Sequence, residues 1–400
     1  TMDFVDRVMR PEDDKVAAHA LKDISSHYDP SFLGSINGAL VGAGGFFGPI
    51  LPNLVMPVAR LYMRKMVGHL VLDAESDALN KILDKAAESG EQLNLNLLGE
   101  AVLGEEEAKS RAQRTLKLIQ NPRVTYVSVK ASSMVAQLNH WDIDGSVERL
   151  KERLRPLYQA AADRTDKVFI NMDMEEYHDL HLTIRLFKEL LSEPEFLTLD
   201  AGIVLQAYLP DTFDALKDVA DFAKERVAKG GGKVKVRIVK GANLSMETVQ
   251  GEVHDWPLAT YTNKLDVDAN YYRLLDFILR EEYADSVRIG VATHNLYTAA
   301  MAYELGKKRG VLHMMDSEML QGMSPAQQAA VRKVFEGRQI LYTPVVHADD
   351  FDVAVSYLVR RLEENSAPQN FLYALFAPGE EPLADQEETF RRAVAKRWDT

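Results

Sequence analysis

The chain has 400 residues, 46% of them hydrophobic and 27% charged, which is typical of a globular protein with one large core or two domains. Its formal net charge of −13 disfavours nucleic acid as a partner, because phosphate binding requires a basic surface. The chain has no cysteine, which excludes disulfides, thiolate metal ligands and cysteine nucleophiles. The charged N-terminus lacks the apolar core of a secretory signal, so we expect a cytoplasmic protein.

The first distinctive feature is an uncharged, glycine-rich segment over residues 31–59. Its length would suffice to cross a bilayer, but Pro49, Pro52 and Pro57 interrupt it. We therefore expect a buried or loosely ordered arm, with peripheral contact at the inner face of a membrane left open. A continuous helix is predicted from Pro57 to Gly90, where glycine ends it. Residues 1–90 are the predicted N-terminal helical and apolar arm.

Short apolar or β-branched segments then alternate with amphipathic helices to about residue 365. The predicted strands are Gln92–Gly99, Val124–Lys130, Lys167–Asp173, Gly202–Tyr208, Val234–Lys240, Val287–Thr293, Val311–Asp316 and Gln339–Pro344. The predicted helices include Val147–Ala162, Asp214–Ala228, Asp268–Glu282 and Pro325–Phe335. This alternation favours an α/β fold, a (βα)8 barrel over residues 91–372, with an acidic C-terminal tail or linker over 373–400. A doubly wound open sheet is disfavoured because no strand leads into a G-x-G-x-x-G loop.

Polar side chains stand at the carboxyl end of nearly every predicted strand, where the active sites of such barrels lie. They are Glu100, Lys130, Asp173, Gln206 with Tyr208, Arg237 with Lys240, Thr293-His294-Asn295, Glu318 and Tyr342. A purely structural barrel would need few of them, because burying unpaired charge is costly. The set predicts an active site.

Two kinds of chemistry fit these residues. A divalent metal could be held by Asp173, Glu175, His294 and Glu318, as in a metal-dependent lyase or isomerase. Lys130, Arg237 and Lys240 would oppose a cation and favour instead a phosphorylated cofactor with a small carboxylate substrate. The leading hypothesis therefore assigns no metal. A third alternative is an inactive barrel that binds a membrane through residues 31–59.

A pair of adjacent arginines near the end of the barrel suggests where a carboxylate would bind. In a helix, Tyr357, Arg361 and Glu364 share one face at spacings i, i+4 and i+7, with Arg360 one step around. Each guanidinium offers a planar fork that matches a carboxylate. The alternative is a solvated helix face with an internal Arg–Glu pair.

Nine motifs occur in a characteristic order: LNLLGEAV, VSVKAS, DMEE, LQAY, RIVKGAN, ATHN, EMLQGM, LYTPV and YLVRRLEEN. In this order the chain resembles the proline dehydrogenase family, and within it the proline dehydrogenase domain of bifunctional proline utilization A, over about residues 55 to 372. The resemblance implies a distorted (βα)8 barrel that holds FAD noncovalently. L-Proline would be oxidised to Δ1-pyrroline-5-carboxylate by hydride transfer to flavin N5, and electrons would pass to a membrane quinone.

The same resemblance implies roles for individual residues. Asp173 and Arg237 would be catalytic, with Arg237 beside flavin N5. The substrate would be bound by Lys130, Arg360, Arg361, Tyr342, Tyr357 and Leu320, with Glu100 as a gate paired to Arg360. The FAD would be held by Met174, Gln206, Arg237, Val239, Lys240, Gly241, Ala242, Thr293, His294, Asn295 and Glu364.

The chain departs from the family pattern at two places. Asn243-Leu244 stands where many relatives have Tyr-Trp, which concerns the pocket and the adenine end of FAD. Glu318 stands where relatives often have glutamine. The second enzyme of the bifunctional proteins is an aldehyde dehydrogenase and needs a cysteine nucleophile, so the chain is expected to be either a single-function enzyme or an excised domain. No oligomeric state is predicted.

Overall fold

The structure is a computed structural model that describes residues 7–8, 11, 13–27, 42–67, 71–74, 76–99, 102, 104–347, 354, 357–358, 361, 364 and 367–399. The chain divides into two compact units. Unit 1 comprises Thr1–Leu79 and Pro344–Tyr373, and unit 2 comprises Asn80–Thr343 and Ala374–Thr400. Glu100, Arg360 and positions 31–41 of the apolar segment lie outside the described residues.

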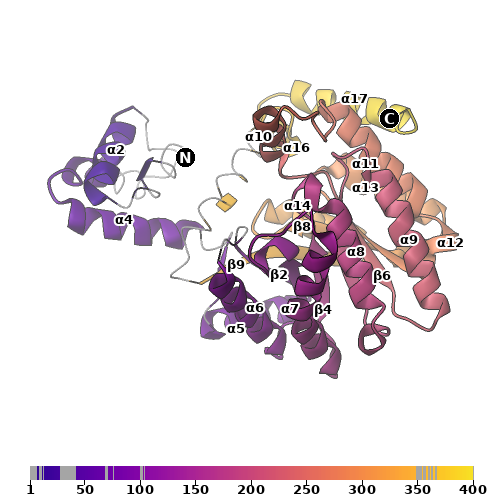
Figure 1. The fold of residues 1–400 in the computed structure, drawn as a ribbon. Helices are drawn as coiled ribbons and strands as arrows, with labels where there is room; N and C mark the ends of the chain where they lie inside the picture. Colours follow the sequence, from indigo (N-terminus) through magenta and orange to yellow (C-terminus); the bar gives the residue numbers. More distant parts are fainter. Residues whose placement is uncertain are drawn as a thin grey trace. The chain divides into compact units, whose positions relative to one another are not determined.

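Unit 2 is built on a ring of parallel strands, drawn from purple through orange in Figure 1. The ring runs in chain order from β2 to β8, and β9 closes it by pairing with both β8 and β2. The strands are β2 (Gln92–Leu97), β3 (Tyr126–Lys130), β4 (Phe169–Asp173), β5 (Ala201–Gln206), β6 (Val234–Val239), β7 (Val287–Ala292), β8 (Met315–Leu320) and β9 (Gln339–Val346). Because a strand in a closed barrel is covered on both faces, β5 and β9 are buried at every position. The predicted (βα)8 barrel is confirmed.

Helices connect the strands and cover the outside of the ring (Figure 1). They are α5 (Ser76–Ser89), α6 (Glu105–Gln120), α7 (Ile143–Asp163), α8 (Leu180–Leu191), α9 (Thr212–Ala228), α10 (Leu244–His254), α11 (Lys264–Ile278), α12 (Glu281–Ala284), α13 (Leu296–Lys308) and α14 (Pro325–Val334). Short 3-10 helices lie at Ala131–Ser133, Tyr177–Asp179, Pro194–Phe196 and Leu312–Met314. The amphipathic pattern places their apolar faces inward, as in α8, where Leu182, Leu186 and Leu190 are buried.

Two sequence predictions in the barrel are corrected. The strand predicted at Val311–Asp316 instead runs over Met315–Leu320, after a 3-10 turn. The prediction places the strand too early because β8 contains Asp316 and Glu318. Buried charge is unusual in a strand unless a partner from another strand neutralises it. The helix predicted at Asp268–Glu282 is divided at Leu279–Arg280 into α11 and α12.

The C-terminal segment joins unit 2 rather than leaving it. It contains α16 (Phe371–Phe376) and α17 (Glu381–Lys396), and α17 packs against α11 (Figure 1). Phe390 meets the rings of Tyr272 and Tyr297, each at a centroid distance of 5.5 Å. Beyond α17, the side chains of residues 397 and 398 donate to the Asp276 carboxylate, each at 2.9 Å. The segment predicted as a tail or linker thus includes a docked helix.

In unit 1, α2 (Asp14–His27) packs against α4 (Pro52–Val67). Leu21, Ile24 and Met56 lie in their shared apolar core, and Arg60 donates to Asp14 at 2.7 Å. The continuous helix predicted from Pro57 to Gly90 is wrong. It is interrupted by the two-residue strand β1 (Leu72–Asp73), which pairs with residues 345–346 of β9.

Part of the apolar segment is helical, at residues 42–47 and from Pro52 onward. Large apolar side chains along this stretch are exposed, among them Phe46, Ile50, Leu54 and Leu61. Among the described residues, no helix has both the length and the apolar character needed to cross a membrane.

Candidate active site

The carboxyl ends of the parallel strands meet at one rim of the barrel, and the register aligns the predicted polar residues there. Lys130 at the end of β3 is level with Asp173 at the end of β4. Gln206 of β5 is level with Val239 of β6. The fold therefore gathers residues that are far apart in sequence, as the alternation of strands and helices predicted.

Asp173 is the centre of a buried hydrogen-bond network. Its Oδ2 accepts from the Tyr342 hydroxyl at 2.7 Å, and its Oδ1 accepts from Asn171 at 2.8 Å and Ser128 at 3.1 Å. Arg237 Nη1 lies 3.8 Å from Oδ1. Burial raises the pKa of the Asp173 carboxyl, while Arg237 and the Tyr342 hydroxyl oppose that rise. The carboxylate is held in one orientation by groups from four strands.

Arg237 links this network to a second buried acid. Its Nε lies 2.7 Å from Glu318 Oε2, and its guanidinium lies over the Tyr342 ring at 4.4 Å. Burial by itself favours the neutral form of Arg237, but Glu318 and Asp173 raise its pKa above the ordinary value. Arg237 is therefore a fixed cation between two carboxylates.

Glu318 also pairs with a lysine that the sequence analysis did not single out. Lys235 Nζ lies 2.7 Å from Glu318 Oε1 and 3.0 Å from Asp316 Oδ2. Arg288 donates to the same Asp316 oxygen at 2.7 Å. Arg288 is on β7, between the other two strands, whereas Lys235 on β6 and the two acids on β8 come from non-neighbouring strands, so they meet inside the barrel. The alternate positions 235 and 237, and 316 and 318, are the sequence signal that could have revealed them.

Lys130 pairs with an acid on the loop that follows the next strand. Its Nζ donates to Glu175 Oε1 at 2.9 Å, and Ser132 bonds the other oxygen of the same carboxylate. The backbone carbonyl of Glu175 accepts from Gln206 Nε2 at 3.0 Å. Glu175 thereby ties the loops that follow β3, β4 and β5.

A second cationic group lies after β6. Lys240 and Lys264 both pair with the single carboxylate of Asp268. Burial and the neighbouring Lys240 lower the pKa of Lys264, and the two lysines lower the pKa of Asp268 against the effect of its burial. Two ammonium groups that share one carboxylate leave an excess of positive charge here. Nothing in the sequence singles out Lys264 as a site residue, because it is an ordinary lysine in the first turn of a helix.

The glycine after Lys240 is required by its neighbour. Gly241 has a φ of 129°, and a Cβ there would lie 2.4 Å from the Tyr208 ring. Ala242 follows it in the loop leading to α10, where Asn243 occupies the N-cap position and Leu244 is exposed. Met174, directly after Asp173, is buried.

The Thr293-His294-Asn295 segment has structural duties of its own. Asn295 caps α13, since its Oδ1 accepts from the backbone N–H groups of residues 297 and 298. The Thr293 hydroxyl accepts from the Asn295 N–H at 3.0 Å. His294 Nε2 accepts from the Leu320 backbone N–H at 3.0 Å, so its ring proton is on Nδ1. The segment is fixed against β8 at the same rim.

The predicted metal ligands do not form a metal site. Glu318 is engaged by two cations and His294 by a backbone donor. Within the described part of the chain, one group of three or more histidine, aspartate or glutamate residues could hold an ion, and it contains neither of these residues. The geometry disfavours the metal-dependent alternative.

Unit 1 carries the remaining predicted residues. Tyr357, Arg361 and Glu364 are helical, and they lie on one face as predicted. Arg361 Nη1 donates to Glu364 Oε2 at 2.6 Å, and the guanidinium lies 5.3 Å from the Tyr357 ring centre. The Arg361 Nε is buried without a hydrogen-bond acceptor among the described residues.

Comparison with known proteins identifies the family. The family model described as proline dehydrogenase matches residues 79–374. The chain belongs to the proline dehydrogenase family. No curated protein sequence is significantly similar to the chain.

Solved structures agree with this assignment. Proline utilization A from Corynebacterium freiburgense is 61% identical with a TM-score of 0.77, over 84% of this chain and 33% of that one. Proline utilization A from Bdellovibrio bacteriovorus, inactivated by N-propargylglycine, is 28% identical with a TM-score of 0.77, over 98% of this chain and 39% of that one. A proline utilization A mutant from Bradyrhizobium japonicum, 21% identical with a TM-score of 0.70 over 98% of this chain and 42% of that one, shares the fold. The chain thus spans about a third to two fifths of the length of these structures.

The proline dehydrogenase barrel offers groups that fit a flavin dinucleotide. Gln206 Oε1 is buried at the rim and has no hydrogen-bond partner among the described residues. Lys240 and Lys264 supply the positive charge that a diphosphate needs. A buried amide acceptor at the end of β5, with two partly exposed lysines after β6, suits an anionic cofactor that has a polar ring edge.

Proposed function

We propose that the chain is an FAD-dependent proline dehydrogenase that oxidises L-proline to Δ1-pyrroline-5-carboxylate. The single observation that supports this most is the buried Asp173–Tyr342–Arg237 constellation at the barrel rim. An acid, a phenol and a fixed cation in contact suit a small zwitterionic substrate beside an electron acceptor that becomes anionic. Membership of the proline dehydrogenase family supports the same substrate.

The cofactor would be held by residues in or just after β4 to β7, together with Glu364 of unit 1. We assign this role to Met174, Gln206, Arg237, Val239, Lys240, Gly241, Ala242, Thr293, His294, Asn295 and Glu364. When bound, FAD would supply the acceptor for the two electrons and the hydride from proline C5. Lys264 is added to the set on its charge, since it shares Asp268 with Lys240.

The substrate carboxylate would be bound by Arg361 together with Arg360 and Lys130. The buried Arg361 Nε supports this role, because Glu364 occupies only the Nη1 side of the fork. Tyr342, Tyr357 and Leu320 would enclose the pyrrolidine ring. Glu100 would pair with Arg360 and close the site.

The chemistry requires a neutral substrate amine, because a hydride leaves C5 most readily when nitrogen keeps its lone pair. A buried site with Arg237 and Lys130 nearby disfavours the ammonium form of the substrate. Tyr342 holds Asp173 through the 2.7 Å hydrogen bond and keeps the carboxylate aligned at the reacting end. Arg237 would stabilise the negative charge that develops on the acceptor.

The electrons would leave to a membrane quinone, from an enzyme in the cytoplasm that contacts the inner face of the membrane. The exposed apolar side chains at residues 46–61 support peripheral contact, because lone exposed apolar residues are common but a series along one segment is not. A catalytically inactive membrane-binding module remains the competing function.

The deciding experiment is anaerobic titration with L-proline while the flavin absorbance is followed. The proposal requires a purified protein with a flavin spectrum that L-proline bleaches. In Arg361→Met, proline affinity should be lost while flavin stays bound. Arg391→Met, on the exposed surface of α17, is the matched control and should behave as the parent. A protein without flavin, or flavin that proline never reduces, would refute the proposal, and equal loss of flavin and proline in Arg361→Met would refute the role of Arg361.

A further inference from the structure

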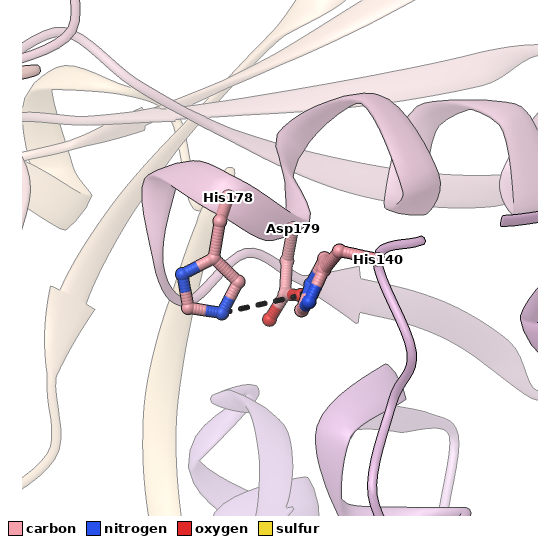
Figure 2. A group of neighbouring side chains, drawn as sticks. All are labelled: His140, His178 and Asp179. Atoms are coloured by element: carbon pink, nitrogen blue, oxygen red, sulfur yellow. Dashed lines mark hydrogen bonds and ion pairs between the residues drawn. The ribbon is translucent and has the colours of Figure 1, made fainter. Parts of the chain in front are cut away.

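Two histidines and an aspartate meet on the loops after β3 and β4, apart from the residues assigned to the flavin and proline. His140 lies between β3 and α7, and His178 and Asp179 lie in the 3-10 turn between β4 and α8. Figure 2 shows the two imidazole rings on either side of the Asp179 carboxylate. One ligand atom from each residue lies within 4.8 Å of the others. None of the three is among the site residues predicted from the sequence.

The distances suit a shared metal ion. His140 Nε2 lies 2.6 Å from Asp179 Oδ1, and His178 Nε2 lies 3.6 Å from the same oxygen. Ligand atoms around a tetrahedral ion with bonds of about 2.0–2.1 Å are roughly 3.3 Å apart. The His178 contact is therefore close to the required spacing, and the His140 contact must open slightly. A metal ion would take the place of the proton that now bridges His140 and Asp179.

A second carboxylate orients one of the histidines. Glu176 Oε2 lies 3.3 Å from His178 Nδ1, on the opposite side of the ring from Asp179. A carboxylate at that position favours the tautomer with its proton on Nδ1, which leaves the Nε2 lone pair for a metal. This carboxylate–histidine arrangement is the usual support of a metal-ligating imidazole.

The charge and exposure of the surroundings are also favourable. The carboxylates of Glu176 and Asp179 lie 3.3 and 3.6 Å from the two ring nitrogens of His178, so the local negative charge favours a cation. The Asp179 carboxylate is buried, whereas the side chains of His140 and His178 are 34% and 43% exposed. An ion could therefore reach the two histidines from solvent, while the buried Asp179 carboxylate is already held in place.

We propose that His140, His178 and Asp179 bind a divalent transition-metal cation of the Zn²⁺ class. Two imidazoles and one carboxylate are a common zinc ligand set, and imidazole selects against Mg²⁺ and Ca²⁺, which prefer oxygen. The bound ion ties the loop after β3 to the loop after β4. Lys130 and Glu175 already join the bases of these loops, so the ion adds a second tie farther along them.

The test is calorimetric titration of Zn²⁺ into the purified flavin-bound protein. The protein should carry no histidine tag, because a tag would itself bind Zn²⁺ and add to the ten histidines of the chain. One Zn²⁺ should bind per chain and raise the melting temperature, and Mg²⁺ should do neither. Saturable binding should be lost in His140→Ala and His178→Ala, whose exposed side chains make misfolding a minor concern. Glu176→Gln should weaken Zn²⁺ binding by roughly 10-fold while retaining the stoichiometry.

His181→Ala is the matched control, because His181 is exposed on α8 three residues from His178. It should bind Zn²⁺ as the parent does. Absence of saturable binding in the parent protein would overturn the proposal, and so would equal binding by the parent and both His→Ala variants. The result does not depend on proline oxidation, so it stands or falls separately from the proposed function.

Discussion

Substitution of Glu318 by glutamine gives the sharpest test of the buried charge network. The Glu318 and Lys235 side chains are 0% and 1% exposed, so neither can recruit water when its partner is lost. The change removes the negative charge that Lys235 and Arg237 each contact at 2.7 Å. It leaves Lys235 with Asp316 at 3.0 Å and Arg237 with Asp173 at 3.8 Å. Each cation then depends on its second carboxylate, and Asp316 is already shared with Arg288.

The expected loss of stability depends on the carboxylate that each cation still contacts in the variant. Removing one partner of a buried ion pair costs about 3–5 kcal/mol. Because both cations retain a second carboxylate, we expect the lower end, about 3 kcal/mol. Lys235→Met should lower the stability by a similar amount, since it leaves the buried Glu318 carboxylate with Arg237 but without Lys235. The double variant leaves Arg237 with Asp173 and Asp316 with Arg288, so it should be no less stable than either single variant.

The measurement is a double-mutant cycle on thermal unfolding of the barrel. A loss of about 3 kcal/mol should lower the melting temperature by roughly 5 °C in a unit of this size, from an unfolding entropy of about 2.1 cal/mol/K per residue. Glu106→Gln is the control, since Glu106 is 91% exposed and its pair with Lys109 should contribute less than about 1 kcal/mol. An unchanged melting temperature in Glu318→Gln would refute the reasoning. So would stability losses of Glu318→Gln and Lys235→Met that simply add in the double variant, because the two residues would then not be coupled.

Three further outcomes are expected. Partial burial raises the pKa of Asp276, but its arginine and tryptophan donors hold that pKa below the ordinary value of 3.8. The carboxylate therefore stabilises the fold fully above pH 3.8, and this stabilisation is lost as the pH falls toward the lower pKa of the folded state. Asp276→Asn should lower the melting temperature at pH 7, and the difference in melting temperature between the variant and the parent should narrow below pH 3.8. Phe390→Ala should cost about 3 kcal/mol and expose α17 to limited proteolysis, whereas Arg391→Ala, with a side chain 72% exposed, should not. Tyr342→Phe removes a donor that lowers the pKa of Asp173, so the acid limb of kcat/KM for proline should move to higher pH; an unchanged limb would separate Asp173 from the essential ionisation.

The barrel could be predicted because its signal is local and repeated. Each strand is a short apolar segment followed by an amphipathic helix, and all eight predicted strands overlap those in the structure, although the one at Val311–Asp316 shares only its last two residues with β8. The exception in register, β8, carries Asp316 and Glu318 where a buried strand is expected to be apolar. Nothing near them in sequence shows that Lys235 and Arg237 would neutralise them.

The same limit applies to the ends of the chain and to the candidate metal site. β1 is two residues long and exists through its pairing with residues 345–346 of β9. Residues 381–396 fall in the segment predicted as a tail or linker, and their packing on α11 shows that they form a docked helix. His140 and His178 are 38 positions apart and become neighbours because β3 and β4 are adjacent strands.

The sequence by itself determined the family, the repeating strand–helix order and the kinds of residue that stand at the strand ends, because each depends on motifs or periodicities within a few tens of residues. The tertiary structure decided which charges meet. Lys130 pairs with Glu175, Lys240 with Asp268, and Arg237 with Glu318. A closed barrel brings side chains of distant strands into one interior, and the energy of a buried charge depends on the partner that it finds there.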